Sequence, residues 1–294
     1  MATEKRKQAK DLDPSGPLYE VAEVARRFEE SAASYARNGW KRRIINSIVR
    51  PRRTHLYCVG LPKSGTHSLA AMFEDRYRAR HEPQLSYISW LKSEHRAGRI
   101  DDAALRRYLN HRDLVLWLEL ESSAGLGVLT PHLVALRPGA RFILTWREPM
   151  GWIRSWTNHV LNRPYGPTSI WTLNRAQEYR PATLEWSPHE EALRARGLYP
   201  IAGYLEYWAR HVRTVLDAVP RERLLVLRVD QIRSRIAEVA RFAGVPEPTL
   251  LHEEAHAFKG LGDQGVIAQV DPGFLAAEVE RCCRTELDRL TAFG

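Results

Sequence analysis

The sequence is poor in cysteine and lacks the long apolar segments that direct proteins to membranes or to secretion. Its 294 residues include only three cysteines, Cys58 and the adjacent pair Cys282 and Cys283, so neither a disulfide framework nor a CxxC metal pattern occurs. The amino terminus, MATEKRKQAKDLDPSG, is charged and lacks the apolar core of a signal peptide. No run of about 18 apolar residues follows. These absences predict a cytoplasmic protein that does not span a membrane.

Acidic residues are the second shortage. The chain carries 44 Lys and Arg against 35 Asp and Glu, which gives a net charge of +9 and a pI near 9.6. This balance predicts attraction to phosphorylated ligands, polyanions or an anionic membrane surface. The basic residues are spread along the whole chain, so an evenly basic surface is the alternative interpretation, and nucleic acid is not indicated as a partner.

Apolar residues are plentiful, and from residue 54 they gather in short β-rich runs. Hydrophobic residues make up 44% of the chain, enough to bury a sizeable core. The runs are HLYCVG, RARHEP, DLVLWLEL, RFILTWR and RLLVLRV. Such continuous runs suit strands covered on both faces, and the helical stretches between them suit parallel crossovers. We therefore expect a three-layer α/β/α fold with a central parallel sheet of about five strands, of the P-loop nucleotide-binding type.

The amino-terminal segment differs in pattern and sets the expected domain division: residues 1–53 as a basic helical extension and 54–294 as the catalytic domain. Residues 17–50 are expected to form helices, with Val21, Val24 and Phe28 at helical spacing before the basic stretch WKRRIINSIVRPRR. Two interpretations stay open. The segment is a helical pair packed on the core with its basic side in water, or it makes peripheral contact with an anionic membrane.

A glycine-bearing loop, GLPKSGTHSL at residues 60–69, follows the first expected strand and leads into a helix near Gly65. A helix amino terminus offers unpaired N–H groups and the positive end of its dipole, to which Ser64, Thr66 and Ser68 add hydroxyls and Lys63 a full charge. This arrangement predicts an anion site. A Walker A loop would end in Gly-Lys-Ser/Thr, whereas here the lysine precedes the glycine, which disfavours an ordinary ATPase or kinase.

The segment PKSGTHS resembles the 5′-phosphosulfate loop of the sulfotransferase family that uses 3′-phosphoadenosine 5′-phosphosulfate (PAPS) as donor. The resemblance implies that Lys63 contacts the bridging oxygen of the donor. It further implies that the rest of the loop binds the donor's 5′ end, through Ser64, Gly65, Thr66, His67 and Ser68.

Further along, RFILTWREPMGWIRS resembles the family's 3′-phosphate site, where an arginine at a strand end is followed eight positions later by a serine. Arg147 and Ser155 have that spacing, and an arginine fork suits phosphate oxygens. VLRVDQIRSRIAEVARFAGVPEP resembles the strand, acidic turn and helix before the family's last ligand loop. In that loop the sequence keeps Lys259 and Gly260 but has Phe258 where the family carries arginine, which puts this phosphate contact in doubt.

The resemblance implies in-line sulfuryl transfer to a hydroxyl or amine, with no metal demanded. A hydroxyl acceptor needs a general base, and the ends of the second and third strands supply the candidates His81, Glu82, Glu119 and Glu121. Glutamate after the phosphate loop serves the family's glycan-modifying members, so Glu82 is the first choice, with His81 as its partner. Glu121 alternatively caps a helix beginning near Ser122, and Glu119 alternatively pairs with a core arginine.

Aromatic residues after the arginine motif predict the acceptor side. Trp152, Trp156, His159 and Tyr165 precede an irregular stretch with Trp171, Tyr179 and Trp186, which we interpret as a loop or lid, although Trp152 and Trp156 also suit core packing. The acceptor stays open between a glycan, a lipid-linked sugar and a small secondary metabolite. The rival functions are a P-loop kinase or NTPase that holds Mg²⁺, and a module that only binds a nucleotide or an anionic surface.

Overall fold

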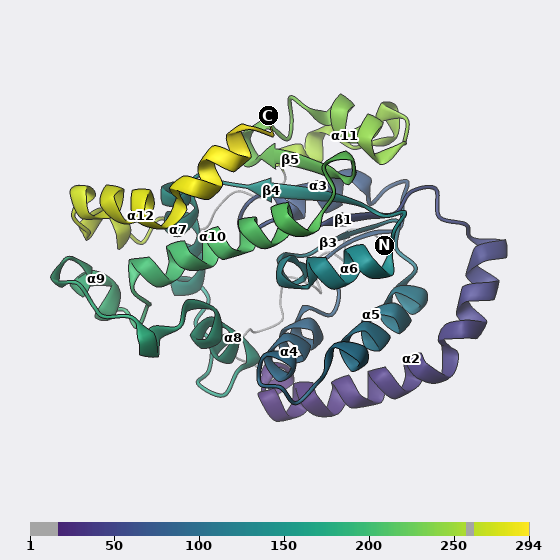
Figure 1. The fold of residues 1–294 in the computed structure, drawn as a ribbon, viewed down its shortest axis with the longest axis horizontal. Coiled ribbons are helices and arrows are strands. Elements are labelled where there is room, and N and C mark those ends of the chain that lie inside the picture. Colours follow the sequence, from purple (N-terminus) through teal and green to yellow (C-terminus); the bar gives the residue numbers. More distant parts are fainter. Residues whose placement is uncertain (1–16, 257–261, 294) are drawn as a thin grey trace.

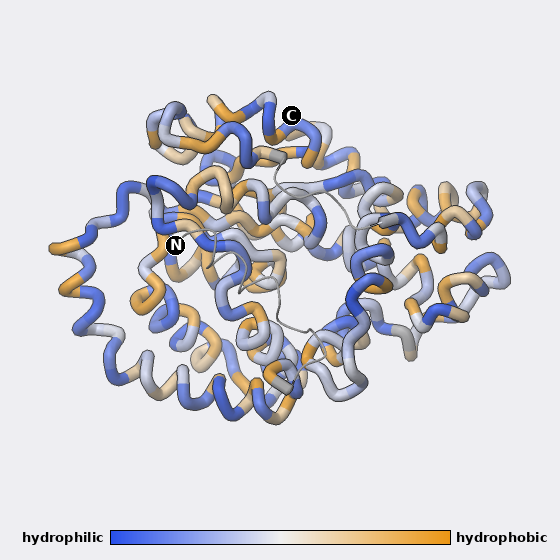
Figure 2. Tube along the Cα trace, turned by 180° about the vertical axis from the view of Figure 1, so that it is seen from behind, coloured by the Kyte–Doolittle hydropathy of each residue, from blue (hydrophilic) through white to orange (hydrophobic). Residues whose placement is uncertain are grey.

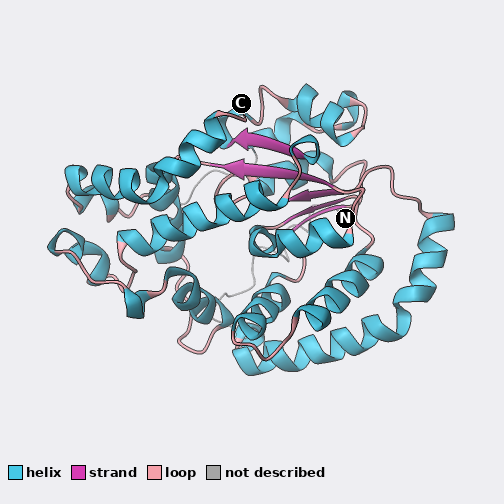
Figure 3. Cartoon of the chain, viewed as in Figure 1, coloured by secondary structure: helices cyan, strands magenta, loops and turns pink. Residues whose placement is uncertain are grey.

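The computed structural model describes residues 17–256 and 262–293. A five-stranded sheet lies at its centre, as Figures 1 and 3 show. The strands are β1 (Leu56–Cys58), β2 (Ala79–His81), β3 (Leu120–Ser122), β4 (Arg141–Trp146) and β5 (Leu224–Arg228). The α-helices are α2 (Val21–Val49), α3 (Thr66–Phe73), α4 (Leu85–Arg96), α5 (Asp102–Leu116), α6 (Thr130–Leu136), α7 (Pro149–Leu161), α8 (Ile170–Tyr179), α9 (Glu191–Arg194), α10 (Ile201–Ala218), α11 (Ile236–Ala243) and α12 (Pro272–Thr291).

The strands all run parallel, in the order β2-β3-β1-β4-β5. Leu56 pairs with Leu120 on one side and with Arg141 on the other, so β1 is the central strand. Parallel pairing requires each chain reversal to pass over a face of the sheet. The expected parallel sheet of about five strands is therefore confirmed.

Side chains along the strands alternate between the two faces of the sheet, so the strands contribute to two separate hydrophobic cores. Tyr57, Phe142 and Leu144 point into the larger core, which α4, α5, α6, α7, α10 and α12 cover. Leu56, Cys58 and Ile143 point into the other core, which α3 and α11 cover. Burial on both faces explains why the strands read as continuous apolar runs, and it confirms the three-layer α/β/α architecture.

The third expected strand is largely wrong. Of the run DLVLWLEL at 113–120, residues up to Leu116 belong to the end of α5, and Trp117 then turns the chain with a left-handed backbone at φ 49°. Asp101 caps the start of α5 by accepting a hydrogen bond from the Ala104 N–H. The apolar run thus spans two elements, and only its last residue, Leu120, begins β3.

The amino-terminal segment is a single long helix rather than a helical pair. A short 3₁₀ turn, η1 (Pro17–Tyr19), precedes α2, whose first two-thirds bury Val24, Phe28 and Tyr35 against α4 and α5. Its last third lies at the periphery of the molecule, as the purple ribbon in Figure 1 shows, and contacts the end of α5 through Asn46. In the described part of the chain, no helix combines the length and apolarity needed to cross a bilayer.

The expected lid region is partly regular structure. Residues 170–179 form α8, which is capped by the Ser169 hydroxyl, and Tyr179 is buried in the larger core. Trp152 is also fully buried, so its packing interpretation is the correct one. The carboxyl-terminal helix α12 packs along α10 and buries Cys283 and Glu286.

Candidate functional site

The sheet topology fixes where a ligand can enter. Helix α3 connects β1 to β2 at one edge of the sheet, whereas the chain that leaves β4 leads to β5 at the other edge. The neighbours β1 and β4 are thus the point where the winding direction reverses, and a crevice opens outside their carboxyl ends. The loops that leave these two strands carry Lys63 and Arg147.

The loop after β1 is shaped by close backbone approach. A Cβ on Gly60 would lie 1.9 Å from the Thr145 Oγ1 and 2.6 Å from the Thr145 carbonyl oxygen, so only glycine fits. Gly65 caps α3 with a left-handed backbone at φ 95°. The Ser64 hydroxyl donates to the Leu61 carbonyl oxygen at 2.5 Å and lies 2.9 Å from that of Thr145. This buried hydroxyl therefore closes the loop instead of facing the crevice as expected.

Three ring N–H groups hold the backbones of these loops from the helix layer. The Trp152 indole donates to the Pro62 carbonyl oxygen at 2.8 Å, and the Trp208 indole donates to that of Arg147 at 3.0 Å. His211 Nε2 lies 2.7 Å from the Val59 carbonyl oxygen. All three side chains are buried, so the position of both loops depends on α7 and α10. Sequence patterns did not predict the roles of Trp208 and His211.

The two expected phosphate-binding clusters share one cleft. Lys63 comes from the loop after β1, and Arg147 and Ser155 come from the end of β4 and from α7. The remaining lining residues are Gly151, Arg154, Asn158 and His159. Positions 151, 154, 155 and 158 follow one another at intervals of three or four residues and therefore share one face of α7. This spacing from Ser155 would have identified Arg154 and Asn158 as lining residues from the sequence.

The cleft is strongly cationic. Burial, followed by the charges of Arg147 and Arg163, lowers the pKa of Lys63 to about 8, while the Glu82 carboxylate acts in the opposite direction. Burial also lowers the pKa of Arg147. No carboxylate is among the residues that line this cleft in the described part of the chain. Cations crowded together in this way are ready to receive an anionic ligand.

Backbone strain marks two of the expected catalytic residues. Lys63 has φ 62° and Glu82 has φ 47°, both in the left-handed region that non-glycine residues rarely adopt. Glu82 follows β2 directly, and its N–H donates to the Ser122 carbonyl oxygen at 2.8 Å. Such strained residues concentrate at functional sites.

The remaining loop residues take different positions. Thr66 is buried, and its hydroxyl lies 3.2 Å from His81 Nε2. His67 is exposed, and its ring packs edge-on against His81 at 5.1 Å. Ser68 is buried in the first turns of α3. The phosphate loop and the end of β2 are thus joined through His81.

Two of the four expected base candidates form buried ion pairs. Both carboxylate oxygens of Glu121 accept from the Arg112 guanidinium at 2.7 Å. Glu119, fully buried, pairs with Arg53 and Arg78, as the alternative interpretation expected. Glu121 lies within β3 and caps no helix, because Ser123 is the N-cap of the following 3₁₀ helix, η2 (Ala124–Leu129). The capping interpretation of Glu121 was therefore wrong.

Lys259 and Gly260 lie outside the described residues. Just beyond them, Asp263 Oδ1 accepts from the Asn158 side-chain amide at 2.9 Å, and the Gln264 N–H donates to Asn158 Oδ1 at the same distance. Asn158 itself lines the cleft. The chain that follows the expected last ligand loop is therefore fastened to the cleft wall.

Comparison with known proteins decides the family. A family model described as a sulfotransferase domain matches residues 55–254, which is more than half of the chain. The chain belongs to the sulfotransferase family. Among curated proteins no match was found.

A solved structure supports the fold of this sulfotransferase. The sulfotransferase STF9 from Mycobacterium avium aligns with a TM-score of 0.51 at 12% identity, over 94% of this chain and 88% of that one. A sulfotransferase from Alicyclobacillus acidocaldarius aligns with a TM-score of 0.43 at 17% identity, over 82% of this chain and 98% of that one.

The sulfotransferase cleft also has an aromatic wall. The rings of Trp156 and His159 stack at 5.4 Å with an interplanar angle of 19°. Burial, then the charges of Lys63, Arg163 and Arg175, lowers the pKa of His159 to about 4, so its imidazole is neutral at pH 7. Trp156 Nε1 and His159 Nδ1 are buried and have no hydrogen-bond partner.

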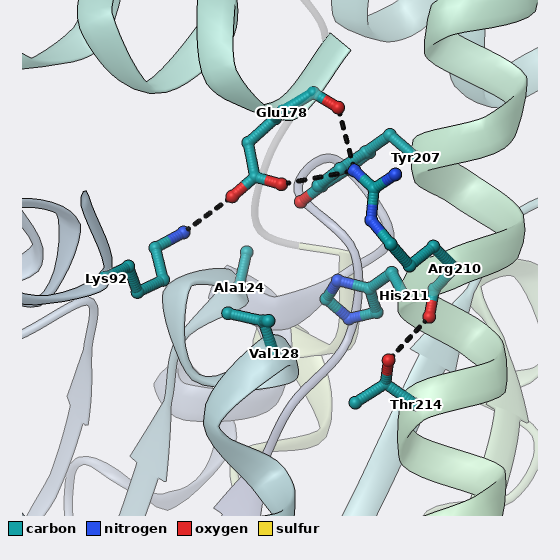
Figure 4. A pocket seen from close by; sticks show the side chains of 8 residues that line it. All are labelled: Lys92, Ala124, Val128, Glu178, Tyr207, Arg210, His211 and Thr214. Atoms are coloured by element: carbon teal, nitrogen blue, oxygen red, sulfur yellow. Dashed lines mark hydrogen bonds and ion pairs between the residues drawn. The ribbon is translucent and has the colours of Figure 1, made fainter. Parts of the chain in front are cut away.

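A second cavity of the sulfotransferase, drawn in Figure 4, contrasts with the cleft in charge. Lys92 and Arg210 point into it together with the buried carboxylate of Glu178, which binds both, at 3.2 Å and 3.4 Å. Burial acts to raise the pKa of Glu178, but Lys92, Arg96 and Arg210 together lower it to about 2. One carboxylate lies between two cations in this cavity, so its positive charge is partly compensated.

Proposed function

We propose that this sulfotransferase moves a sulfuryl group from 3′-phosphoadenosine 5′-phosphosulfate to a hydroxyl or amine of its acceptor. One observation carries the proposal: Lys63, Arg147 and Ser155 line a single cationic cleft at the winding reversal of the sheet. The two resembling motifs therefore lie where they can hold the two ends of one doubly phosphorylated nucleotide.

In this proposal Lys63 acts at the leaving group. When bound, the donor supplies the sulfuryl group and a phosphate that leaves with negative charge. The Lys63 ammonium donates a hydrogen bond to the bridging oxygen and neutralises that charge as it develops, which is a stabilisation specific to the transition state. Lys63 lines the cleft from a backbone in the left-handed region.

Arg147 and Ser155 bind the 3′-phosphate. The guanidinium offers two parallel N–H donors and the hydroxyl a third. The Arg147 side chain lies over Gly151, whose absent Cβ would be 3.6 Å from its Cγ and Cδ. Arg154, which the sequence analysis did not single out, adds a further positive charge on the same wall. Gly65 and the first turn of α3 direct backbone N–H groups at the 5′ end of the donor.

Glu82 is the proposed general base. Glu119 and Glu121 pair with arginines, whereas the charge of Glu82 acts on the pKa of Lys63, and this contrast supports the choice of Glu82. Glu82 accepts the proton of the acceptor hydroxyl as the oxygen attacks the sulfur. His81, which contacts the Thr66 hydroxyl, positions the phosphate loop beside Glu82.

The acceptor side is the Trp156–His159 stack, which offers an aromatic face and a neutral imidazole. These groups suit the hydroxyl of a glycan, a lipid-linked sugar or a small secondary metabolite.

The three cysteines are free thiols, which fits the reducing cytoplasm that we infer. A kinase would need an acidic strand end for Mg²⁺, and Glu119 and Glu121 are engaged by arginines instead.

A ligand-induced shift of the melting temperature tests the donor. Adenosine 3′,5′-bisphosphate without metal is expected to raise the melting temperature of the wild type, and ATP with Mg²⁺ is not. The opposite result would favour the kinase. Incubation with sulfur-labelled donor and a pooled library of hydroxyl and amine acceptors then tests transfer itself. The Glu82→Gln variant should lose transfer while keeping the temperature shift.

A further inference from the structure

The last third of α2 exposes apolar side chains on an otherwise polar surface. Five of them, which we name the outer stripe, are between 53% and 76% exposed: Trp40, Ile44, Ile45, Ile48 and Val49. The other large apolar side chains classed as exposed in the described chain, Leu18 and Val128, are each 39% exposed. Figure 2 shows this concentration as orange segments at the free end of the helix. A contiguous patch of this kind indicates a binding surface.

Helical spacing places the outer stripe away from the protein body. Trp40, Ile44 and Ile48 recur every four residues and therefore lie on one side of α2. The opposite side faces α5, because Asn46 Nδ2 donates to the Leu114 carbonyl oxygen at 3.4 Å and Gly39 lies against Leu114. The helix end thus turns Gly39 and Asn46 toward α5 and presents its apolar side outward.

Positive charge borders the stripe. Between Ser31 and Thr54 the sequence has no Asp or Glu, and Arg37, Lys41, Arg42 and Arg43 lie on the same stretch of helix. Their side chains are exposed. An apolar helix face bordered by Lys and Arg matches a surface of acyl chains beneath anionic headgroups. A second copy of this chain is a poor match, because pairing two such faces would bring like charges together.

We propose that the outer stripe and its basic border bind the surface of an anionic membrane. Trp40 and the Ile side chains insert at the boundary between headgroups and acyl chains, and Arg42 and Arg43 contact lipid phosphates. The inference stands apart from the proposed function, because it uses no residue of the cleft.

The attachment leaves the cleft open. Of the two ends of α2, the first is tied to the segment after α7, since the Val21 N–H donates to the Thr168 carbonyl oxygen, and the second leads into the amino end of β1. In a parallel sheet the amino ends lie at the edge opposite the carboxyl ends, where the cleft opens. A 29-residue helix is about 43 Å long. The membrane contact is therefore remote from the reaction, and turnover of a water-soluble acceptor should not depend on it.

Vesicle flotation with the full chain tests the proposal. Vesicles of equal parts phosphatidylcholine and phosphatidylglycerol are expected to carry the protein, pure phosphatidylcholine vesicles much less, and added salt should weaken binding. Ile44→Ser combined with Ile48→Ser, and separately Arg42→Glu combined with Arg43→Glu, should each weaken binding about tenfold or more. Both variants should retain the melting temperature, because the altered side chains are exposed.

The matched control is Arg194→Glu combined with Arg196→Glu, two exposed arginines in and just after α9, at the other end of the molecule in Figure 1. It changes the net charge as much as the Arg42 and Arg43 variant does and should leave binding within about twofold, because the surface field falls off within a Debye length. Equal losses in the two charge variants, or unchanged binding in the Ile variant, would overturn the proposal. So would a concentration-dependent dimer, seen by analytical ultracentrifugation, that the Ile variant abolishes.

Discussion

The two cavities of this sulfotransferase are both lined by basic side chains, yet only one is suited to an anion. In the cleft outside β1 and β4, burial and the charge of Arg147 lower the pKa of Lys63, burial lowers the pKa of Arg147, and no carboxylate lines the cleft in the described part of the chain. In the cavity between α8 and α10, Lys92 and Arg210 surround Glu178. Surplus charge, rather than the number of basic residues, therefore identifies the ligand site in an arginine-rich chain.

Their structural roles follow from the same difference. Buried charges that pair with one another fix the packing of helices, because removing one partner leaves the other desolvated. Cations that lie close together without a lining carboxylate lower the free energy of unfolding, and binding of an anion raises it again.

Lys63→Ala should separate chemistry from binding. We expect the turnover number to fall about 10³-fold, equivalent to about 4 kcal/mol of transition-state stabilisation. The affinity for adenosine 3′,5′-bisphosphate should fall less than about tenfold, because Arg147 and Ser155 still hold the nucleotide. Steady-state rates and calorimetric titration measure the two quantities. An equal loss in both would assign Lys63 to binding alone.

Glu178→Gln should lower stability through the cavity between α8 and α10 and leave the cleft unaffected. Removing the carboxylate leaves Lys92 and Arg210 without their partner and should lower the free energy of unfolding by about 3 kcal/mol at pH 7. Since the folded pKa of Glu178 is lowered to about 2, its stabilisation is complete above the unfolded value near 4.5 and is lost as the pH falls toward 2. Denaturant titrations of both proteins should therefore converge at low pH. Nucleotide affinity at pH 7 should not change.

Arg147→Ala and Arg210→Ala compare one arginine from each cavity. The first should weaken binding of adenosine 3′,5′-bisphosphate about 30-fold, the loss expected for charge-assisted hydrogen bonds to a phosphate. The second should leave that affinity within about twofold while lowering the melting temperature. If both variants lost nucleotide affinity equally, general positive charge rather than the geometry of the cleft would explain binding.

The smallest expected effect is a dependence on pH. The pKa of Lys63 is lowered to about 8 in the ligand-free cleft, so its ammonium is charged below pH 8 and neutral above it. The phosphates of the nucleotide are already ionised at pH 7. Affinity should therefore decrease several-fold between pH 7 and about 9.5. Lys63→Arg, which stays charged throughout, should remove this decrease, and a persistent decrease would mean that another group titrates.

The sequence predicted the sheet well because β1, β3, β4 and β5 are largely buried on both faces, which favours continuous apolar runs. It failed at the third strand, where the end of α5 and the start of β3 have the same apolar character and only the left-handed turn at Trp117 separates them. The position of α2 was also missed, since helical spacing reveals which side chains share a face but not which face the body covers.

For the site, the residues predicted by local motifs came together, whereas those whose partners are distant in sequence were harder to judge. Lys63, Arg147 and Ser155 meet because both motifs follow strands at the same edge of the sheet. That Glu121 is paired with Arg112 depends on how α5 packs against β3, which spacing alone does not reveal. The Ser64 hydroxyl likewise turns inward because Thr145 lies on the neighbouring strand.

Three buried rings hydrogen-bond the backbones of the two ligand loops from the helix layer: the indoles of Trp152 and Trp208 and the imidazole of His211. Loops supported in this way keep their shape when neighbouring surface segments are exchanged. A change of acceptor specificity, whether by natural divergence or by engineering, can therefore alter the loop between α7 and α8 while these three rings and the helices that carry them keep both ligand loops in place.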